Sequence, residues 1–313
     1  MADDIAAVLR GNRGNMAGKP IAPGRIGLMI GLVLLMLAVL VWFYPSVSDF
    51  KAENPSWNGA RDFIDDFQVS PLDSFDALPD TSEETSLIIV PYVTFSSADL
   101  DRLEGYVGSG GRLVVLDDYG FGNQILEHLG LEVRFSGSQL LDPLFNHKNK
   151  NLPRMLNFAA VPATGGVESL VLNHATSLEN APVDRVIAWS SYFSFSDEDQ
   201  DGEWDEGEAR GPLPVIARFE LSDGELLLVA DPSILISGML DMDDNRQFLQ
   251  NIVEGRAFLD QSHLPDVPLD EAKAALRLTR GALATVWGTA GLILLVLALA
   301  LRPVWYNRGG QDG

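Results

Sequence analysis

Two long apolar runs constrain this chain more than any other feature of its sequence. The first, Ile26 to Tyr44, carries no charged residue, and at about 1.5 Å per residue it is long enough to cross a membrane as a helix. The second, Gly281 to Leu301, lies between Arg280 and Arg302 and is equally free of charge. We therefore expect two transmembrane helices, residues 26–44 and 281–301, which attach the chain to a membrane at both ends.

The basic residues beside the first run predict how the chain crosses the membrane. The residues before that run include Arg10, Arg13, Lys19 and Arg25. Basic residues favour the cytoplasmic side, so we expect residues 1–25 and 302–313 to be cytoplasmic tails. The segment between the spans is then extracytoplasmic, and the chain is a two-pass protein of the cell membrane.

Two further observations bear on this topology. Lys273, Arg277 and Arg280 precede the second run and favour the opposite orientation, but the first helix usually dominates. A cleaved signal peptide is the alternative for the first run. That run exceeds the usual length of about 7–15 residues, and no A-x-A-like site follows it.

The charge of the chain is concentrated between the spans. The whole chain of 313 residues has 22 Lys and Arg residues against 44 Asp and Glu residues. Setting aside the two tails leaves 16 basic and 41 acidic residues, a net charge of −25. Such a domain repels nucleic acid and anionic membrane surfaces, so neither is expected as a partner. The chain has no cysteine, which excludes disulfides, thiolate metal sites and cysteine nucleophiles.

A regular alternation of strands and helices predicts the fold of the middle segment. Short apolar runs predict buried strands at Leu87–Val90, Arg112–Leu116 and Leu131–Phe135, with one helix between each pair. Ser96 and Asp99 resemble a capping box that opens the first of these helices. The expected fold class is α/β, a mostly parallel sheet with helices on both faces, flanked by the two transmembrane helices.

The later part of the segment adds further strands and a closing helix. The expected strands are Ser169–Leu172, Arg185–Tyr192, Pro214–Leu221 and Glu225–Ala230. The turn Ser222-Asp223-Gly224 makes the last two a hairpin, which gives the sheet an antiparallel portion. A final apolar helix ends at Gly255, so the domain is expected to span residues 54–255, followed by a linker and an amphipathic helix at residues 256–280.

An acidic segment between two expected strands matches a calcium-binding pattern at every specified position. The pattern D-x-[DN]-x-[DN]-G-x5-E is met by Asp197, Asp199, Asp201, Gly202 and Glu208. In such loops the carbonyl of Glu203 adds an oxygen ligand and Asp205 can hold a water. The expected ligands of a structural Ca²⁺ are Asp197, Asp199, Asp201, Glu203, Asp205 and Glu208. An acidic, solvated turn is the alternative.

The ends of two expected strands form a second candidate site, because open α/β sheets bind ligands at the carboxyl ends of their strands. Asp117, Asp118 and Tyr119 follow one strand, and Asp231 and Ser233 follow another. These five residues are the candidates for ligand binding. The alternative is that they are turn and helix-cap residues. The four histidines are scattered without the spacing of metal ligands, so no zinc site is expected.

Several short motifs in this order resemble the class I glutamine amidotransferase-like fold. More closely, the chain is similar to the membrane-anchored family called domain of unknown function 4350, which is related to soluble domains of gliding-motility transporter subunits. The matching segments are Gly110 to Leu116, Gly122 to Leu126, Leu228 to Ser233 and Asp244 to Leu249. The resemblance covers roughly Asn54 to Gly255.

The resemblance implies that the fold is kept and glutaminase activity is lost. The amidotransferase motif G-x-C-x-G-x-Q has Gly120 at its nucleophile position here, and a glycine cannot attack a carbonyl. Asp231-Pro232-Ser233 takes the place of the later His-Pro-Glu. The resemblance also suggests assembly with a MoxR-type ATPase and other membrane proteins.

We therefore predict a non-catalytic, membrane-anchored envelope protein whose extracytoplasmic domain binds a partner protein or a small ligand. The first alternative is an accessory subunit of an ABC-type or MoxR-ATPase-associated membrane complex. The second is a hydrolase that uses Asp117, Asp118 or Asp231, although no paired base or oxyanion arrangement is recognisable in the sequence.

Overall fold

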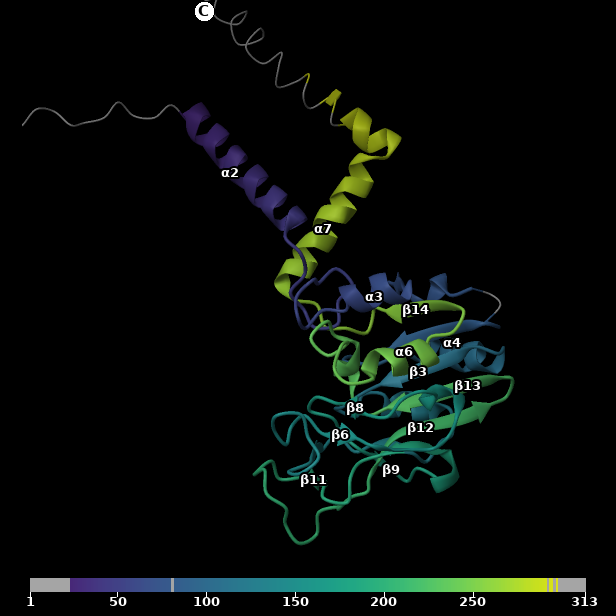
Figure 1. The fold of residues 1–313 in the computed structure, drawn as a ribbon. Helices are drawn as coiled ribbons and strands as arrows, with labels where there is room; N and C mark the ends of the chain where they lie inside the picture. Colours follow the sequence, from purple (N-terminus) through teal and green to yellow (C-terminus); the bar gives the residue numbers. More distant parts are fainter. Residues whose placement is uncertain (1–22, 80–81, 292, 295–296, 298–313) are drawn as a thin grey trace, which may run out of the picture. The chain divides into compact units, whose positions relative to one another are not determined.

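The computed structural model describes residues 23–79, 82–291, 293–294 and 297, which belong to two compact units (Figure 1). One unit contains the described residues up to Tyr44 together with those from Leu269 onward. The other is Pro45–Pro268, and all strands of the described residues belong to it. The α/β unit is thus longer at both ends than the 54–255 domain expected from the sequence.

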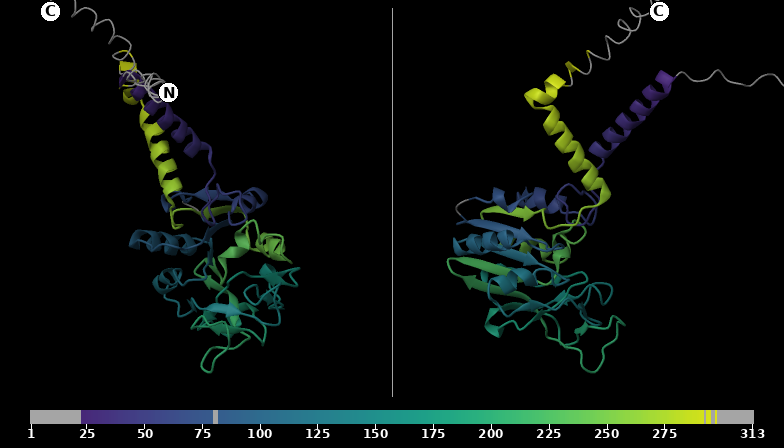
Figure 2. Two further views of the ribbon diagram at one scale, coloured as in Figure 1. Left: turned by 90° about the vertical axis from the view of Figure 1, so that its left-hand side faces the viewer. Right: turned by 180° about the vertical axis from the view of Figure 1, so that it is seen from behind.

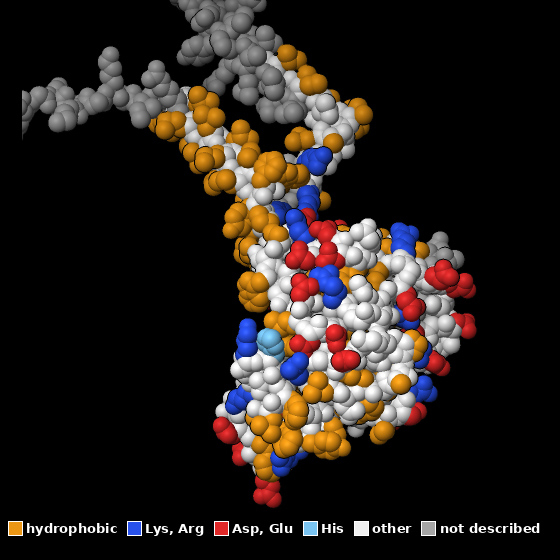
Figure 3. All heavy atoms as spheres, in the orientation of Figure 1, with side chains coloured by type: hydrophobic (Ala, Val, Ile, Leu, Met, Phe, Trp, Pro, Cys, Tyr) orange, Lys and Arg blue, Asp and Glu red, His pale blue; other side chains and the backbone are white. Residues whose placement is uncertain are grey.

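The first unit contains the apolar helix α2 (Pro23–Phe43) and the amphipathic helix α7 (Pro268–Leu283). Within α2, Ile26–Phe43 has a mean hydropathy of 2.8, and none of this segment is buried. Hydrophobic side chains cover the visible surface of α2 (Figure 3). Among the residues that the structure describes, α2 is the one helix long and apolar enough to cross a membrane, as an anchor or as a signal sequence.

The expected second span, residues 281–301, is described only in part. Helix α7 ends at Leu283, a turn follows at residues 284–285, and a helical segment resumes at residues 286–291. Residues 292, 295–296 and 298–301 of the span, and the tails 1–22 and 302–313, lie outside the described residues. A second transmembrane helix and the two-pass orientation therefore stay predictions.

An eight-stranded sheet forms the centre of the α/β unit. Its spatial order is β1 (Ser70–Leu72), β14 (Arg256–Asp260), β2 (Thr85–Ile89), β3 (Arg112–Leu116), β13 (Gly224–Val229), β12 (Pro214–Leu221), β10 (Val186–Trp189) and β7 (Asn157–Phe158). The first five strands pair in parallel, and the last three continue the sheet in antiparallel fashion. The carboxyl ends of the five parallel strands therefore lie along one edge.

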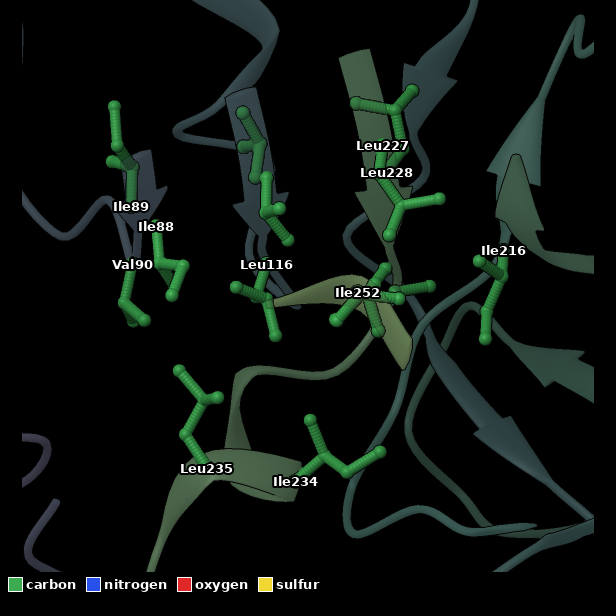
Figure 4. Packing of buried hydrophobic residues seen from close by; sticks show 14 of the residues in the cluster. Ile88, Ile89, Val90, Leu116, Ile216, Leu227, Leu228, Ile234, Leu235 and Ile252 are labelled. Carbon is green, nitrogen blue, oxygen red and sulfur yellow. The ribbon is translucent and has the colours of Figure 1, made fainter. Parts of the chain in front are cut away.

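Helices on both faces bury the central strands. They are α3 (Arg61–Phe67), α4 (Ser97–Gly108), α5 (Asn123–His128) and α6 (Asn245–Ile252). Figure 2 shows α4 and α6 on opposite sides of the sheet. Every residue of β2 is buried, because a strand covered on both faces exposes neither of its alternating side-chain sets. Figure 4 shows Ile88 and Ile89 of β2 beside Leu116 of β3. Leu227 and Leu228 of β13 lie on the next strand.

Short strands and single helical turns complete the unit around the central sheet. Three two-stranded sheets pair β4 (Arg134–Phe135) with β9 (Leu178–Glu179), β5 (Gln139–Leu141) with β11 (Phe195–Asp197), and β6 (Arg154–Met155) with β8 (Leu170–Val171). Four single turns of 3-10 helix are η1 (Phe75–Ala77), η2 (Pro162–Thr164), η3 (Val183–Arg185) and η4 (Pro232–Leu235).

Several sequence predictions are confirmed at the level of single elements. Strands β3 and β12 begin and end where expected, and the hairpin of β12 and β13 turns at Ser222-Asp223 with Leu221 opposite Gly224. The capping box of α4 forms: the Ser96 hydroxyl accepts from the Asp99 N–H, and Asp99 accepts from the Ser96 N–H. The mostly parallel α/β sheet with its antiparallel portion is also confirmed.

One predicted strand of the parallel sheet was wrong, one predicted strand forms outside the central sheet, and one central strand was missed. The segment Leu131–Phe135 is not a strand of the parallel sheet, because only β4 forms there and it pairs with β9 outside that sheet. Ser169–Leu172 likewise gives only β8, in a separate small sheet. The parallel strand that the sequence analysis lacked is β14, which occupies the first five residues of the expected 256–280 linker.

The hairpin glycine offers a test of this packing. A Cβ on Gly224 would lie 2.5 Å from the carbonyl oxygen of Gly111 and closer still to that of Val107, both fixed backbone atoms. We expect Gly224→Ala to lower the free energy of unfolding by about 1–3 kcal/mol, as overpacking does.

Gly108→Ala is the matched control, since its Cβ meets no atom within 4 Å and it lies in α4. Alanine is the better helix former, so this variant should keep or raise the stability. Thermal unfolding of the solubilised chain, followed by circular dichroism, measures both. Equal melting temperatures for the two variants would contradict the hairpin packing.

Candidate functional site

The carboxyl ends of four parallel strands bring acidic and aromatic residues to one edge of the sheet. Asp117 follows β3, Asp231 follows β13, Asp260 ends β14, and Tyr92 follows β2. Asp118 contributes to the shifted pKa values of both Asp231 and Tyr92, so the ends of β2, β3 and β13 are electrostatically coupled. The sequence-predicted candidates after β3 and β13 therefore do come together.

Asp117 is a fully engaged turn residue. One carboxylate oxygen accepts from the N–H groups of Tyr119 and Gly120 at 2.9 and 3.0 Å, and the other accepts from Gly122 at 2.6 Å. Burial raises the pKa of Asp117, although these backbone donors oppose the shift. Asp117 thus matches the alternative interpretation, in which it organises the turn after β3 instead of facing a ligand.

Asp231 is engaged in the same way after β13. Its two carboxylate oxygens accept from the N–H groups of Ser233 and Asn173, each at 2.7 Å, and it caps η4. Complete burial raises the pKa of Asp231 to about 8. Ser233 is itself buried, so neither residue presents a free polar group at the surface.

Asp118 differs from both neighbours. Its Oδ1 atom is shielded from solvent and has no hydrogen-bond partner, while the residue as a whole stays partly exposed. Burial, followed by the charge of Asp117, raises the pKa of Asp118 to about 7. A carboxylate oxygen without a donor in a partly dry environment is costly, and residues with shifted pKa values gather at functional sites. Asp118 is therefore the residue of this edge best suited to contact a ligand.

Aromatic rings gather around Tyr92 at this edge, where the charge of Asp118 raises the pKa of Tyr92, and sequence reasoning missed most of these rings. Tyr92 stacks on Phe50 with ring centroids 5.7 Å apart, and it contacts Tyr119 edge-on at 5.7 Å and Phe121 at 6.5 Å. Tyr119 is 63% exposed and Phe121 36% exposed. Tyr92 lies just beyond β2, so the strand-end rule that selected Asp117 could also have selected it. We call Tyr92, Asp118, Tyr119 and Phe121 the edge cluster.

A buried pair of one aspartate and one histidine, Asp260 and His263, lies at the end of β14. His263 contacts Asp260 through Nδ1 at 2.7 Å, and its ring stacks on Phe95 at 4.1 Å and lies 4.9 Å from Phe75. The sequence analysis missed this pair because it assigned β14 to a linker. Both side chains are almost fully buried, so they stabilise the end of the strand and offer no surface to a substrate.

The acidic pattern forms a loop between β11 and β12. The expected strand after the loop is confirmed by β12, whereas β11 begins only at Phe195 and includes Asp197, the first residue of the pattern. Two groups of carboxylates converge in the loop: Asp197, Asp199 and Glu208 in one, and Asp199, Asp201 and Asp205 in the other. In each group the candidate ligand atoms lie within 4.8 Å of one another. Asp199 belongs to both groups. Of the predicted ligands, Glu203 was expected to act through its carbonyl, and its side chain belongs to neither group.

The loop backbone is arranged around these carboxylates. Glu208 accepts from the N–H groups of Glu198 at 2.8 Å and Asp205 at 3.0 Å, which closes the loop. Gly202 has a φ of +80° and bonds through its carbonyl to the Lys150 ammonium. Mutual repulsion, chiefly from Asp201, raises the pKa of Asp205. A cluster of hard oxygen donors whose charges repel fits a hard cation such as Ca²⁺.

Together these features define an α/β domain with a mostly parallel sheet, a carboxyl edge lined by acidic and aromatic residues, and an acidic loop on its antiparallel side. The chain belongs to the family described as domain of unknown function (DUF4350), which it matches over residues 52–253. No curated protein matches the chain.

Solved structures give only distant likenesses. The mmIFT52 N-terminal domain is 12% identical with a TM-score of 0.46, covering 66% of this chain and 92% of that one. A β-galactosidase from Bacillus circulans sp. alkalophilus is 15% identical with a TM-score of 0.30, covering 52% of this chain and 22% of that one. The exo-β-1,4-mannosidase Op5Man5 from Opitutaceae bacterium strain TAV5 is 12% identical with a TM-score of 0.29, covering 56% and 25%. None carries an argument about function.

The raised pKa of Asp118 predicts how stability depends on pH. The folded pKa is about 7, whereas an unfolded Asp titrates near about 4, so the folded state binds an extra proton in between. Stability should therefore fall as the pH rises from about 4 to about 7. Asp118→Asn removes the titrating group, and we expect it to raise the free energy of unfolding at pH 8 by about 2 kcal/mol.

The measurement is denaturant unfolding of both proteins at several pH values. Asp231 titrates in the same direction, so the variant should have a shallower pH dependence, not a flat one. Asp223→Asn, in the exposed hairpin turn, is the control and should follow the wild type. An unchanged slope in Asp118→Asn would show that Asp118 is not held protonated.

Proposed function

We propose that this chain is a non-catalytic, membrane-anchored binding protein whose edge cluster docks a partner protein or a small ligand. The single observation that supports this most is Asp118, whose shielded Oδ1 has no donor while two aromatic rings beside it are exposed. A bound partner that covers the two rings would remove their apolar surface from water, and a positive charge at the cluster would favour the ionised form of Asp118.

Catalysis is the weaker alternative. A hydrolase needs a second accessible acid or base beside Asp118. The carboxylate oxygens of Asp117 and Asp231 already accept hydrogen bonds from backbone N–H groups. We further propose that the fold derives from the class I glutamine amidotransferase-like group. In support, Gly120 lies between β3 and α5 with a φ of +89°, a conformation typical of a sharp turn after a strand, and it has no side chain to act as nucleophile.

For location, we propose a two-pass protein of the cell membrane with both tails cytoplasmic and the α/β unit outside. The support is the exposed apolar helix α2, the basic residues that precede it in the sequence, and the uncharged run from Gly281 to Leu301. An accessory subunit of an ABC-type or MoxR-ATPase-associated complex is compatible with this arrangement, and the edge cluster would then contact the neighbouring subunit.

We also propose that the acidic loop binds Ca²⁺ in a structural role. An extracytoplasmic loop with this donor set would bind at about millimolar calcium, where a site of about 0.1 mM affinity stabilises the folded chain by about 1.4 kcal/mol. The ion would neutralise the repulsion among Asp199, Asp201 and Asp205 and would hold the connection between β11 and β12.

Calcium titration tests this role. We expect millimolar Ca²⁺ to raise the melting temperature of the wild-type chain and to have no such effect on Asp199→Ala, because Asp199 belongs to both carboxylate groups. Glu206→Ala is the matched control, since this exposed acid lies in the same loop and in neither group. If neither calcium nor a chelator changes the melting temperature of the wild-type chain, the loop has no stabilising calcium site.

Site-specific photo-crosslinking in intact cells tests the binding role. A benzoyl-phenylalanine at position 119 should yield a defined crosslinked species, because Tyr119 is the most exposed ring of the edge cluster. The same probe at Tyr192, an exposed tyrosine on the β10–β11 connection, is the control and should not yield that species. Identical patterns from both positions would rule out the edge cluster as the docking surface.

A further inference from the structure

The titratable groups of the edge cluster are one carboxyl group, that of Asp118, and two phenols, those of Tyr92 and Tyr119. The charges that raise the pKa of Tyr119 belong to Asp118 and Asp49, and those that raise the pKa of Tyr92 belong to Asp118, Tyr119, Asp49 and Asp231. Asp49 is exposed and lies next to Phe50, which stacks on Tyr92. Two carboxyl groups therefore act on one exposed tyrosine ring, and each additional negative charge there raises the cost of the others.

The acidic groups of this edge are not arranged as a metal site. Among the described residues, the sets whose ligand atoms converge within 4.8 Å lie elsewhere, on α4 with α5 and in the acidic loop. Asp117 and Asp231 are also occupied by backbone N–H groups. An organic cation needs one carboxylate and a flat apolar contact, and the edge cluster supplies both.

We infer that the edge cluster binds an arginine side chain from a partner polypeptide, an inference that rests on the proposed function. The guanidinium would stack on the exposed Tyr119 ring and donate to the Asp118 carboxylate, and the charge of Asp49, which also acts on Tyr119, would add to the attraction. Arginine fits better than lysine because its planar group combines aromatic stacking with directed hydrogen bonds. A polypeptide fits better than a free cation because Phe121 and Val93 expose further apolar surface nearby in the sequence.

Binding of this cation is coupled to release of a proton. Asp118 faces Asp117, Asp231, Tyr92 and Tyr119, and none of these supplies a positive charge. Asp118 is therefore largely protonated below pH 7, and a guanidinium favours its ionised form. Affinity should rise as the pH increases through about 7, with a proton leaving Asp118 for the solvent.

Saturation-transfer NMR on the full chain in lipid nanodiscs measures this binding. The probe is a capped Gly-Arg-Gly tripeptide, and the matched neutral probe is the same peptide with citrulline. We expect saturation of the arginine side-chain protons, about tenfold weaker for citrulline, because the charge-assisted hydrogen bond is lost. The arginine signal should be several-fold stronger at pH 8 than at pH 5.5.

Two variants and two controls locate the site. Asp118→Asn and Tyr119→Ala should each remove most of the arginine signal at pH 8, whereas Asp223→Asn and Tyr192→Ala should keep it. Equal signals for arginine and citrulline, or an arginine signal that survives Asp118→Asn, would overturn the inference. Stronger binding of propylguanidinium than of the peptide would point to a free small cation and would also overturn it.

Failure of this inference is separable from failure of the proposed function. If position 119 gives a crosslink but the arginine peptide gives no saturation-transfer signal, arginine is rejected as the ligand. The edge cluster then still stands as the proposed docking surface. A silent probe and no crosslink from position 119 would reject both.

Discussion

Burial of carboxyl groups at the carboxyl edge of the parallel sheet is the constraint on which the rest of the structure depends. Asp117, Asp231 and Asp260 are almost completely buried, and an ionised carboxylate in such a place costs several kcal/mol unless donors surround it. The turns after the strands supply backbone donors, and Asn173, elsewhere in the chain, and the side chains of Ser262 and His263 supply the others. A Cβ on Gly122 would lie 3.1 Å from the Asp117 carboxylate, so the glycine allows the chain to approach that closely. The loops of this edge are therefore fixed by the acids they enclose.

Asp118 lies outside this arrangement because successive residues point in different directions. Asp117 turns into the loop and collects its N–H groups, and Asp118 has no donor for Oδ1. The raised pKa of Asp118 limits this cost, because the neutral form of the carboxyl group is favoured below about pH 7. Its removal should stabilise the fold and weaken binding, which is the trade-off expected when a residue is retained for function and not for stability. A purely structural residue would lose stability on substitution.

The sequence identified the elements whose signal is local. The apolar runs of β2, β3 and β12, the Ser96–Asp99 capping box and the Ser222-Asp223 turn each carry their pattern within a few residues. It did not identify β14, because Arg256–Asp260 follows directly on a helix and glycine, and only pairing with β1 and β2 stabilises it. Leu131–Phe135 alternates like a strand, but β3 pairs with β2 and β13 and leaves it no parallel neighbour.

The site was predictable to the same extent. The strand-end rule selected Asp117, Asp118, Tyr119 and Asp231, yet the sequence could not tell which carboxyl group would lack a donor, since this depends on N–H groups such as that of Asn173, far away in the chain. The acidic loop differs from the edge in how its carboxylates are stabilised. Its carboxylates are mostly exposed and repel one another, whereas those of the edge are buried and are stabilised by N–H donors or, at Asp118, by a raised pKa. No residue belongs to both sites, so the proposed calcium binding and the titration of Asp118 should act on stability independently.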